Sequence, residues 1–210
     1  MRFLWLHGFA SGPSSSKGQY VKARLAERGL TLEVPDLNLP SFRELTLTRM
    51  LESLPVEGPL TLFGSSLGGY TAALYAAKNP GLVTSLVLLA PAFDLAARWE
   101  KRMGASDVAL WRAQGSFPFD HYALGGQHEL GVGFLEDALQ HEPFPLPQCP
   151  TLVIQGAKDA VVDPALAREF VRRMEGRATL VELDQGHELN ADLPGLWKLL
   201  EPYVPRPMPK

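Results

Sequence analysis

The chain has 210 residues, of which 46% are hydrophobic and 20% charged, with a formal net charge of -3. This length fits a single domain with a sizeable core. The charge balance excludes the basic footprint of a protein that binds nucleic acid or an anionic membrane, so we expect a small-molecule partner. Nothing in the composition indicates an oligomeric state.

No stretch approaches the roughly 20 apolar residues of a membrane span, and the apolar run 3–6 is too short for a signal peptide. The single cysteine, Cys149, cannot form an intrachain disulfide, which suits a reducing compartment. We therefore expect a cytoplasmic protein in which Cys149 is structural.

Short apolar runs alternate with amphipathic segments along the chain, a pattern typical of a parallel sheet with crossover helices. The pattern predicts strands at residues 2–6, 31–34, 60–64, 84–90, 151–155 and 178–183. It predicts helices at residues 14–28, 45–54, 70–77, 164–174 and 193–200. Serines are placed to cap the first helix and Asp163 the fourth. The predicted fold is α/β, one domain over 1–210 with six parallel strands in the order 2-1-3-4-5-6 and helices on both faces.

A G-x-S-x-G pentapeptide, residues 64–68, lies between the third strand and the helix that follows it. Strand, tight turn and helix form the context of a nucleophile elbow, which lifts a serine hydroxyl out of the backbone. The candidate nucleophile is Ser66. Gly64 and Gly68 are needed where the turning chain passes close to other backbone, although the pentapeptide by itself also arises by chance.

The alternation breaks once, in an insertion formed by residues 94–149. An insertion at the carboxyl end of a parallel sheet lies over the crevice where open α/β sheets bind ligands, so it is a candidate lid. Its aromatic residues can also pack a subsidiary core, and both interpretations stay open for each of them. The candidates for contact with substrate are Trp99, Trp111, Phe117, Phe119 and Tyr122.

A serine hydroxyl needs a neighbouring base, and the base needs a carboxylate that holds its tautomer. After such an elbow the partners follow in the order Ser, acid, His. His187 comes directly after the last predicted strand, at the sheet edge where Ser66 also lies, and is the candidate general base. His121, His128 and His141 lie in the insertion, where lid or surface roles are expected.

Three aspartates compete for the role of the acid. Asp159 follows the strand predicted at 151–155 and is the candidate that orients His187. The side chain of Asp163 is explained as a helix cap. Asp184, only three residues before His187, is the main rival, but we expect it to hold its own loop.

The loop after the first strand, residues 7–12, is glycine-rich and suited to bring a backbone N–H to the substrate. We expect the N–H groups of Phe9 and Leu67 to form an oxyanion hole, with Leu67 at a helix N-terminus. A catalytic role for His7 remains an alternative to the expected one, in which it braces this loop by hydrogen bonding.

Motifs for other chemistries fail on spacing. Residues 12–17 lack the Gly before Lys and the Ser or Thr after it that a phosphate-binding P-loop requires. Ser66 replaces the second glycine of a dinucleotide fingerprint, and His128 and His187 are each followed by Glu without the second His of a zinc motif. We therefore expect neither a metal nor an organic cofactor.

With these residues in place, the chain resembles the α/β-hydrolase superfamily and, within it, the small bacterial YqiA-type esterases. The resemblance rests on the segments 6–9, 14–17, 35–37, 64–70 and 186–189. It implies a serine carboxylesterase that acts on short acyl chains, with Ser66, Asp159 and His187 at the triad positions. The chain lacks the antiparallel strand pair that begins the full superfamily pattern, and its insertion is longer than expected, which leaves substrate size open.

Two other functions stay open at this point. A thioesterase or peptidase can use the same triad, because the acyl half of the reaction is shared. A binding protein can keep the fold without the chemistry.

Overall fold

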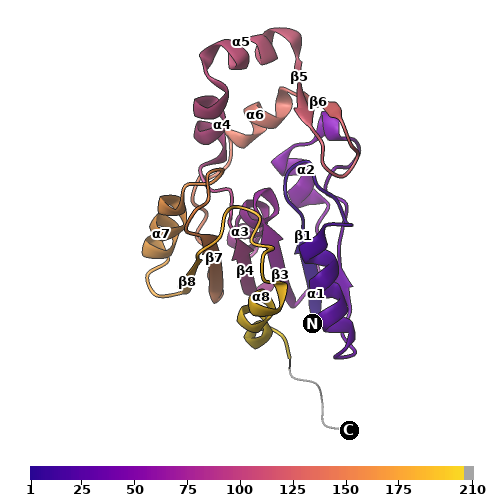
Figure 1. The fold of residues 1–210 in the computed structure, drawn as a ribbon, viewed down its shortest axis with the longest axis vertical. Helices are drawn as coiled ribbons and strands as arrows, with labels where there is room; N and C mark the ends of the chain where they lie inside the picture. The colour runs from indigo at the N-terminus through magenta and orange to yellow at the C-terminus, as the bar shows by residue number, and fades with distance from the viewer. Residues whose placement is uncertain (206–210) are drawn as a thin grey trace.

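The computed structural model describes residues 1–205 and has a six-stranded parallel sheet with helices on both faces (Figure 1). The strands of this sheet are β1 (Arg2–Leu6), β2 (Leu32–Glu33), β3 (Leu60–Ser65), β4 (Val83–Leu89), β7 (Thr151–Gly156) and β8 (Ala178–Leu183). Their spatial order is β2-β1-β3-β4-β7-β8. This is the predicted order 2-1-3-4-5-6, because β5 (Ser116–Asp120) and β6 (Gln127–Gly131) form a separate antiparallel hairpin in the insertion.

The helices outside the insertion are α1 (Ser16–Ala26), α2 (Leu47–Glu52), α3 (Leu67–Lys78), α7 (Pro164–Arg173) and α8 (Leu193–Leu200). Short 3-10 turns are η1 (Phe42–Glu44) and η2 (Glu201–Tyr203). All five helices match predicted ones. The largest difference is that α3 begins at Leu67 rather than at Tyr70, because the first turn after Ser66 runs through Gly68 and Gly69.

Two apolar clusters cover the two faces of the sheet. Because successive side chains of a strand point to opposite faces, Leu4 and Leu6 join one cluster and Phe3 and Trp5 the other. The first cluster includes buried residues of α2, α3 and α7, and the second those of α1 and α8. Both faces are therefore dry, which explains why the central strands are apolar along their length.

The insertion contains α4 (Leu95–Met103), α5 (Ala105–Gln114), the β5-β6 hairpin and α6 (Gly133–Ala138). It leaves the sheet after β4 and lies at the end of the molecule beyond the carboxyl ends of the strands, at the top of Figure 1. Trp111 and Phe134 are buried in the same cluster as α3, so the insertion is packed onto that side of the core.

The predicted helix caps differ in outcome. Asp163 caps α7, since its side chain accepts a hydrogen bond from the Ala165 N–H. The serine cap predicted for α1 is wrong, because Ser15 occupies the cap position without a side-chain hydrogen bond to the helix.

Within residues 1–205 no helix is long and apolar enough to cross a membrane.

Candidate active site

Ser66 occupies a strained turn between β3 and α3. Its φ of 53° and ψ of -115° lie in a region that a residue with a Cβ rarely adopts, and such strain persists only where the surroundings fix it. The Ser66 N–H donates to the Leu89 carbonyl at 2.8 Å, and the Ser66 carbonyl accepts from the Ala92 N–H at 3.0 Å. Two backbone bonds to the β4 side thus hold the nucleophile elbow.

The flanking glycines allow this turn. A Cβ added at Gly64 would overlap the carbonyl oxygen of Gly68, and one added at Gly68 would overlap the carbonyl oxygen of Leu6. Both obstacles are backbone atoms, which cannot rotate away. The predicted need for small residues on both sides of Ser66 is therefore confirmed.

The side chains of Ser66, His187 and Asp159 form a continuous hydrogen-bonded chain. His187 Nε2 lies 3.0 Å from Ser66 Oγ, and His187 Nδ1 lies 2.8 Å from Asp159 Oδ2. An ionised carboxylate only accepts hydrogen bonds, so Nδ1 carries the proton and Nε2 is free to accept from the serine hydroxyl. This is the arrangement in which a histidine removes the proton of an attacking serine.

Asp159 is held by donors on both of its carboxylate oxygens. Oδ1 accepts from the N–H groups of Val161 and Val162, each at 2.8 Å, and Oδ2 accepts from Gln155 Nε2 at 2.9 Å as well as from His187. Burial by itself raises the pKa of Asp159, but the hydrogen bonds from His187, Val162 and Val161 outweigh it and keep the pKa below its ordinary value. The carboxylate is therefore charged and fixed in orientation at neutral pH.

The rival acid lies elsewhere. Asp184 is exposed and pairs with Lys158 at 2.7 Å rather than with His187. The prediction that it holds its own loop is thus only partly right, because its ion pair joins the loop after β8 to the loop after β7. Gln155 and the two valine N–H groups, which hold the acid, were not predicted; no motif marks them.

Two backbone N–H groups are without a partner near the elbow, one on the residue after Ser66 and one in the loop after β1. Within residues 1–205 neither Phe9 nor Leu67 donates its N–H in a hydrogen bond. Gly8 passes close to the elbow, because a Cβ added there would lie 3.5 Å from Ser66 Cβ. Leu67 begins α3, where the unpaired N–H groups and the helix dipole favour negative charge. The site can thus receive an oxyanion.

His7 braces the loop that carries Phe9. Its Nε2 accepts from the Leu37 N–H at 3.0 Å, so its Nδ1 is protonated and donates to the Gly8 carbonyl at 2.9 Å. Burial is the main cause that lowers the pKa of His7, which keeps the ring neutral. Both ring nitrogens are occupied, which supports the expected bracing role.

The remaining histidines do not bond to the triad. His121 is buried and accepts from the Leu124 N–H, His128 contacts the Gly125 carbonyl, and His141 lies against Thr48. Cys149 is buried, and burial raises the pKa of its thiol, which makes it inert. In the part of the chain from 1 to 205, no group of three or more His, Cys, Asp or Glu residues could hold a metal ion.

Aromatic side chains of the insertion pack around the ring of Phe9. Ring centroids lie 4.9 Å from Phe9 for Trp99, 5.7 Å for Phe119 and 5.9 Å for Phe134. Phe42 of η1 completes the group at 5.3 Å. We call these five residues the Phe9 cluster. It joins the insertion to the loop after β1, which carries Phe9.

The five substrate candidates thus differ in position. Trp99 and Phe119 belong to the Phe9 cluster, and Phe117 packs behind Phe119 at 5.5 Å. Trp111 is 0% exposed and donates its Nε1–H to the Leu130 carbonyl, so it belongs to the core of the insertion. Tyr122 is 85% exposed at the tip of the hairpin. Phe42 and Phe134 were not among the candidates, and no local signal separates them from other core aromatics.

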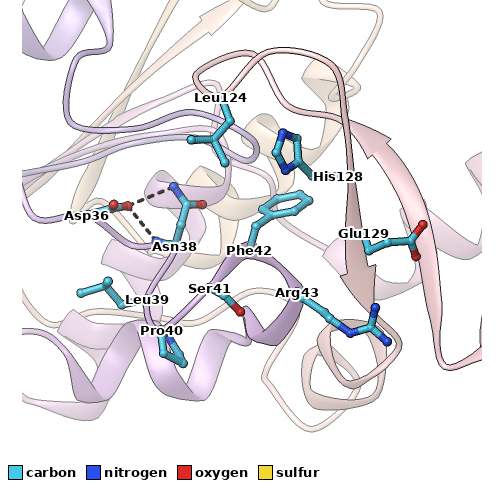
Figure 2. Close-up of a pocket in the computed structure, with 10 residues that line it drawn as sticks. All are labelled: Asp36, Asn38, Leu39, Pro40, Ser41, Phe42, Arg43, Leu124, His128 and Glu129. Carbon is cyan, nitrogen blue, oxygen red and sulfur yellow. Dashed lines mark hydrogen bonds between the residues drawn. The ribbon is translucent and has the colours of Figure 1, made fainter.

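A groove of about 420 Å³ runs between residues 36–43 and the β5-β6 hairpin, as Figure 2 shows. Phe42 stands in its wall, and Asp36 Oδ1 accepts from the backbone and side-chain nitrogens of Asn38 at 3.0 Å. Asp36 Oδ1 also lies 3.6 Å from His7 Nε2, so the groove borders the loop after β1. None of the three triad residues lines it.

The sheet order, the elbow after β3 and the Ser66–His187–Asp159 chain define an α/β hydrolase fold. Residues 2–201 match the uncharacterised protein family UPF0227, and the chain belongs to that family. The resemblance to α/β hydrolases is thereby confirmed.

Solved structures agree on the fold. A protein from Agrobacterium vitis S4 superposes with a TM-score of 0.83 at 22% identity, over 97% of this chain and 88% of that one. Alpha/beta hydrolase domain-containing protein 10 from mouse superposes with a TM-score of 0.78 at 20% identity, over 96% of this chain and 88% of its own.

A curated relative is similar over part of its length. The mitochondrial palmitoyl-protein thioesterase ABHD10 of Bos taurus is 30% identical over 111 residues, which cover 50% of this chain. The match spans only 36% of that relative.

Proposed function

We propose that the protein is a serine carboxylesterase that hydrolyses short-chain acyl esters through an acyl-enzyme. The observation that carries this proposal is the hydrogen-bonded chain from Ser66 Oγ through His187 to Asp159, at 3.0 and 2.8 Å, beside two unpaired N–H groups. Nucleophile, base, orienting acid and oxyanion donors then stand within reach of one carbonyl carbon.

In the proposed reaction, Ser66 Oγ attacks the ester carbonyl while His187 Nε2 takes the hydroxyl proton. The N–H groups of Phe9 and Leu67 stabilise the negative oxygen, a contribution worth about 10²–10³ in rate for each donor. The imidazolium of His187 then protonates the leaving alcohol as the tetrahedral intermediate collapses to the acyl-enzyme. Water, deprotonated by His187 Nε2, attacks the acyl group, and the imidazolium then returns this proton to Ser66 Oγ as the acyl–oxygen bond breaks and the acid is released. Asp159 stays ionised throughout.

The insertion supports the short-chain assignment. The Phe9 cluster fills the space beside the oxyanion loop with closely packed rings. Trp99 and Phe119, which belong to this cluster, are partly buried against the core and are the side chains through which the insertion would contact an acyl group as a lid.

The test is a p-nitrophenyl ester series from acetate to decanoate, run on wild type, Ser66→Ala and Ser65→Ala. We expect Ser66→Ala to lower kcat at least about 10³-fold, because triad members act as a unit. Ser65→Ala, one residue away, should stay within about threefold of wild type. A fluorophosphonate probe should label wild type and not Ser66→Ala. Undiminished hydrolysis by Ser66→Ala contradicts the mechanism, and unlabelled, inactive wild type favours a binding protein of the same fold.

A second candidate function is thioester hydrolysis, favoured by the 30% identity to a palmitoyl-protein thioesterase. The same triad serves both bonds, and the leaving group is recognised by residues outside it. Comparing kcat/KM for butyryl thioester, butyryl ester and butyryl amide decides between them. A thioester preference over the ester of more than about tenfold, equal to about 1.4 kcal/mol in the barrier, assigns the protein as a thioesterase.

A further inference from the structure

Lys17 is a buried cation that the proposed reaction does not use. It lies in the first turn of α1, is 8% exposed, and donates a hydrogen bond from Nζ to the backbone carbonyl of Glu188. Glu188 directly follows His187. Lys17 therefore touches the loop that carries the proposed base, although it is 171 residues away in sequence.

The burial of this ammonium group needs an explanation beyond packing. Taking a charge out of water is unfavourable unless it is well paired, and burial lowers the pKa of Lys17 accordingly. The carboxylate of Glu188 is 3.8 Å away and 74% exposed, so it is a weak partner. The stronger contact is the one to the carbonyl, and an apolar side chain would fill the space without the penalty.

The loop at this point is strained. Leu189 has a φ of 48°, in the left-handed region, and its side chain is buried. A leucine keeps such a conformation only where its surroundings fix it. The Glu188 carbonyl belongs to the peptide plane that precedes Leu189, and the φ of Leu189 is the rotation about the N–Cα bond by which the chain leaves this plane. A hydrogen bond to this carbonyl therefore fixes the strained angle.

The other side of His187 has its own anchor. The Gln185 carbonyl accepts from the Lys158 N–H at 2.9 Å, which ties the start of the loop to the segment that holds Asp159. Beyond His187, Lys17 is the side chain that bonds to the backbone of Glu188. The loop that carries His187 is thus held by a backbone hydrogen bond at Gln185, before the histidine, and by the Lys17 hydrogen bond at Glu188, after it.

We propose that Lys17 is a positioning residue for His187: by holding the Glu188 carbonyl, its ammonium group fixes the peptide plane between Glu188 and Leu189, in the loop that carries His187, and keeps His187 Nε2 within reach of Ser66 Oγ. The inference rests on the proposed function, since it assigns Lys17 a role in the same reaction. It requires both the reach and the charge of the ammonium group.

The main test is Lys17→Met, which keeps the length and apolar stem of the side chain and removes its charge. With p-nitrophenyl butyrate, kcat should fall by roughly 10- to 100-fold, because small displacements of a reacting group cost about that much, while KM stays within about twofold. The rate of fluorophosphonate labelling of Ser66 should fall in parallel. Far-UV circular dichroism and a melting curve show whether the variant is folded.

Chemical rescue separates positioning from structure. Lys17→Ala removes three methylene groups and the ammonium group of the side chain. The n-propylammonium ion has the same three carbons and the same charge, so it can occupy the space that the substitution leaves. We expect this ion to restore kcat saturably, with far-UV circular dichroism showing that the variant is folded before the ion is added. A folded but slow variant that n-propylammonium does not rescue overturns the proposal in favour of a structural role.

Two matched controls isolate the contact. Lys22→Met makes the same substitution at an exposed position of α1 and should leave kcat unchanged. Glu188→Ala removes the carboxylate but keeps the carbonyl, so it should stay within about threefold of wild type. A loss in Glu188→Ala as large as in Lys17→Met overturns the proposal, because Lys17 then acts through the side chain.

Two further outcomes are decisive. A folded Lys17→Met with wild-type kcat overturns the proposal and leaves the proposed function standing. If Lys17→Met does not fold, Lys17→Gln replaces it, because the neutral amide of glutamine is too short to reach the Glu188 carbonyl. A low kcat in Lys17→Gln supports the proposal, and a wild-type kcat overturns it. Wild-type protein that neither hydrolyses esters nor labels at Ser66 contradicts the proposed function itself.

Discussion

The elbow and the insertion meet at the same edge of the sheet but are held there by different forces. The elbow is fixed by backbone hydrogen bonds to Leu89 at the end of β4 and to Ala92 just beyond it, and by glycines that lie close to other backbone atoms. The insertion meets the oxyanion loop mainly through ring packing on Phe9, with one backbone bond from Ala123 to Ala10 at 3.3 Å. Backbone contacts tolerate no change of geometry, whereas packed rings can be exchanged for others of similar volume. We therefore expect substitutions near the elbow to affect chemistry and those in the insertion to affect substrate choice.

The largest expected effect on kcat is at Asp159, which follows β7 and belongs to the sheet rather than to the insertion. Asp159→Asn should lower kcat by roughly 10³- to 10⁴-fold, because the amide favours the wrong tautomer of His187. Asp184→Asn is the matched control, since that carboxylate pairs with Lys158 and should leave kcat within about twofold. Steady-state kinetics on both variants decide which aspartate serves His187, and a larger loss in Asp184→Asn contradicts the assignment.

The lowered pKa of Asp159 also predicts that the free energy of unfolding depends on pH. Its pKa in the folded protein is lowered, so the folded state favours the charged carboxylate. This contribution is present above the unfolded pKa of about 3.9 and is lost as the pH falls through the lower folded value. The difference in unfolding free energy between wild type and Asp159→Asn should therefore shrink between pH 5 and pH 3, measured by urea denaturation. A difference that grows toward acid contradicts the direction of the shift.

Matched glycine substitutions compare the two regions directly. Gly68→Ala should destabilise the fold by about 3 kcal/mol, because the added Cβ meets the backbone of Leu6 and His7. Gly133→Ala, at the start of α6 in the insertion, meets nothing within 4 Å and should stay within about 0.5 kcal/mol of wild type. Urea denaturation of both variants makes the comparison. Equal losses would show that the insertion is held as rigidly as the elbow.

The smallest expected effect is at Phe119 in the Phe9 cluster. Phe119→Leu keeps most of the apolar volume but removes the edge contact with the Phe9 ring and the tilted ring contact with Trp99. We expect a loss of about 1 kcal/mol in stability and a changed preference along the ester series, with kcat for acetate within about threefold. Phe117→Leu, one layer further out, is the control. A collapse of kcat for every ester would mean that the insertion shapes the oxyanion hole itself.

The sheet and the elbow could be predicted because their signals are local. Apolar runs bounded by turns indicate the six strands, and the glycines around Ser66 indicate the tight turn before α3. The expectation that Ser66, Asp159 and His187 meet follows from the rule that the loops after parallel strands share one edge of the sheet, and their order along the chain is the one typical of a nucleophile elbow. The serine cap predicted for α1 was wrong, because Ser15 Oγ is buried without a hydrogen bond to the helix, and the residue type at the cap position does not reveal this.

The sequence by itself therefore determined the fold class, the candidate nucleophile and the loops that carry its partners, because each depends on a pattern within about a dozen residues. Only the tertiary structure decided that His187 faces Asp159 and not Asp184, that Trp99 and Phe119 reach Phe9 while Tyr122 points to solvent, and that Lys17 holds the loop of His187. These contacts join residues that lie far apart in the chain. Their geometry is set by how helices and loops pack on the sheet, which no local pattern encodes.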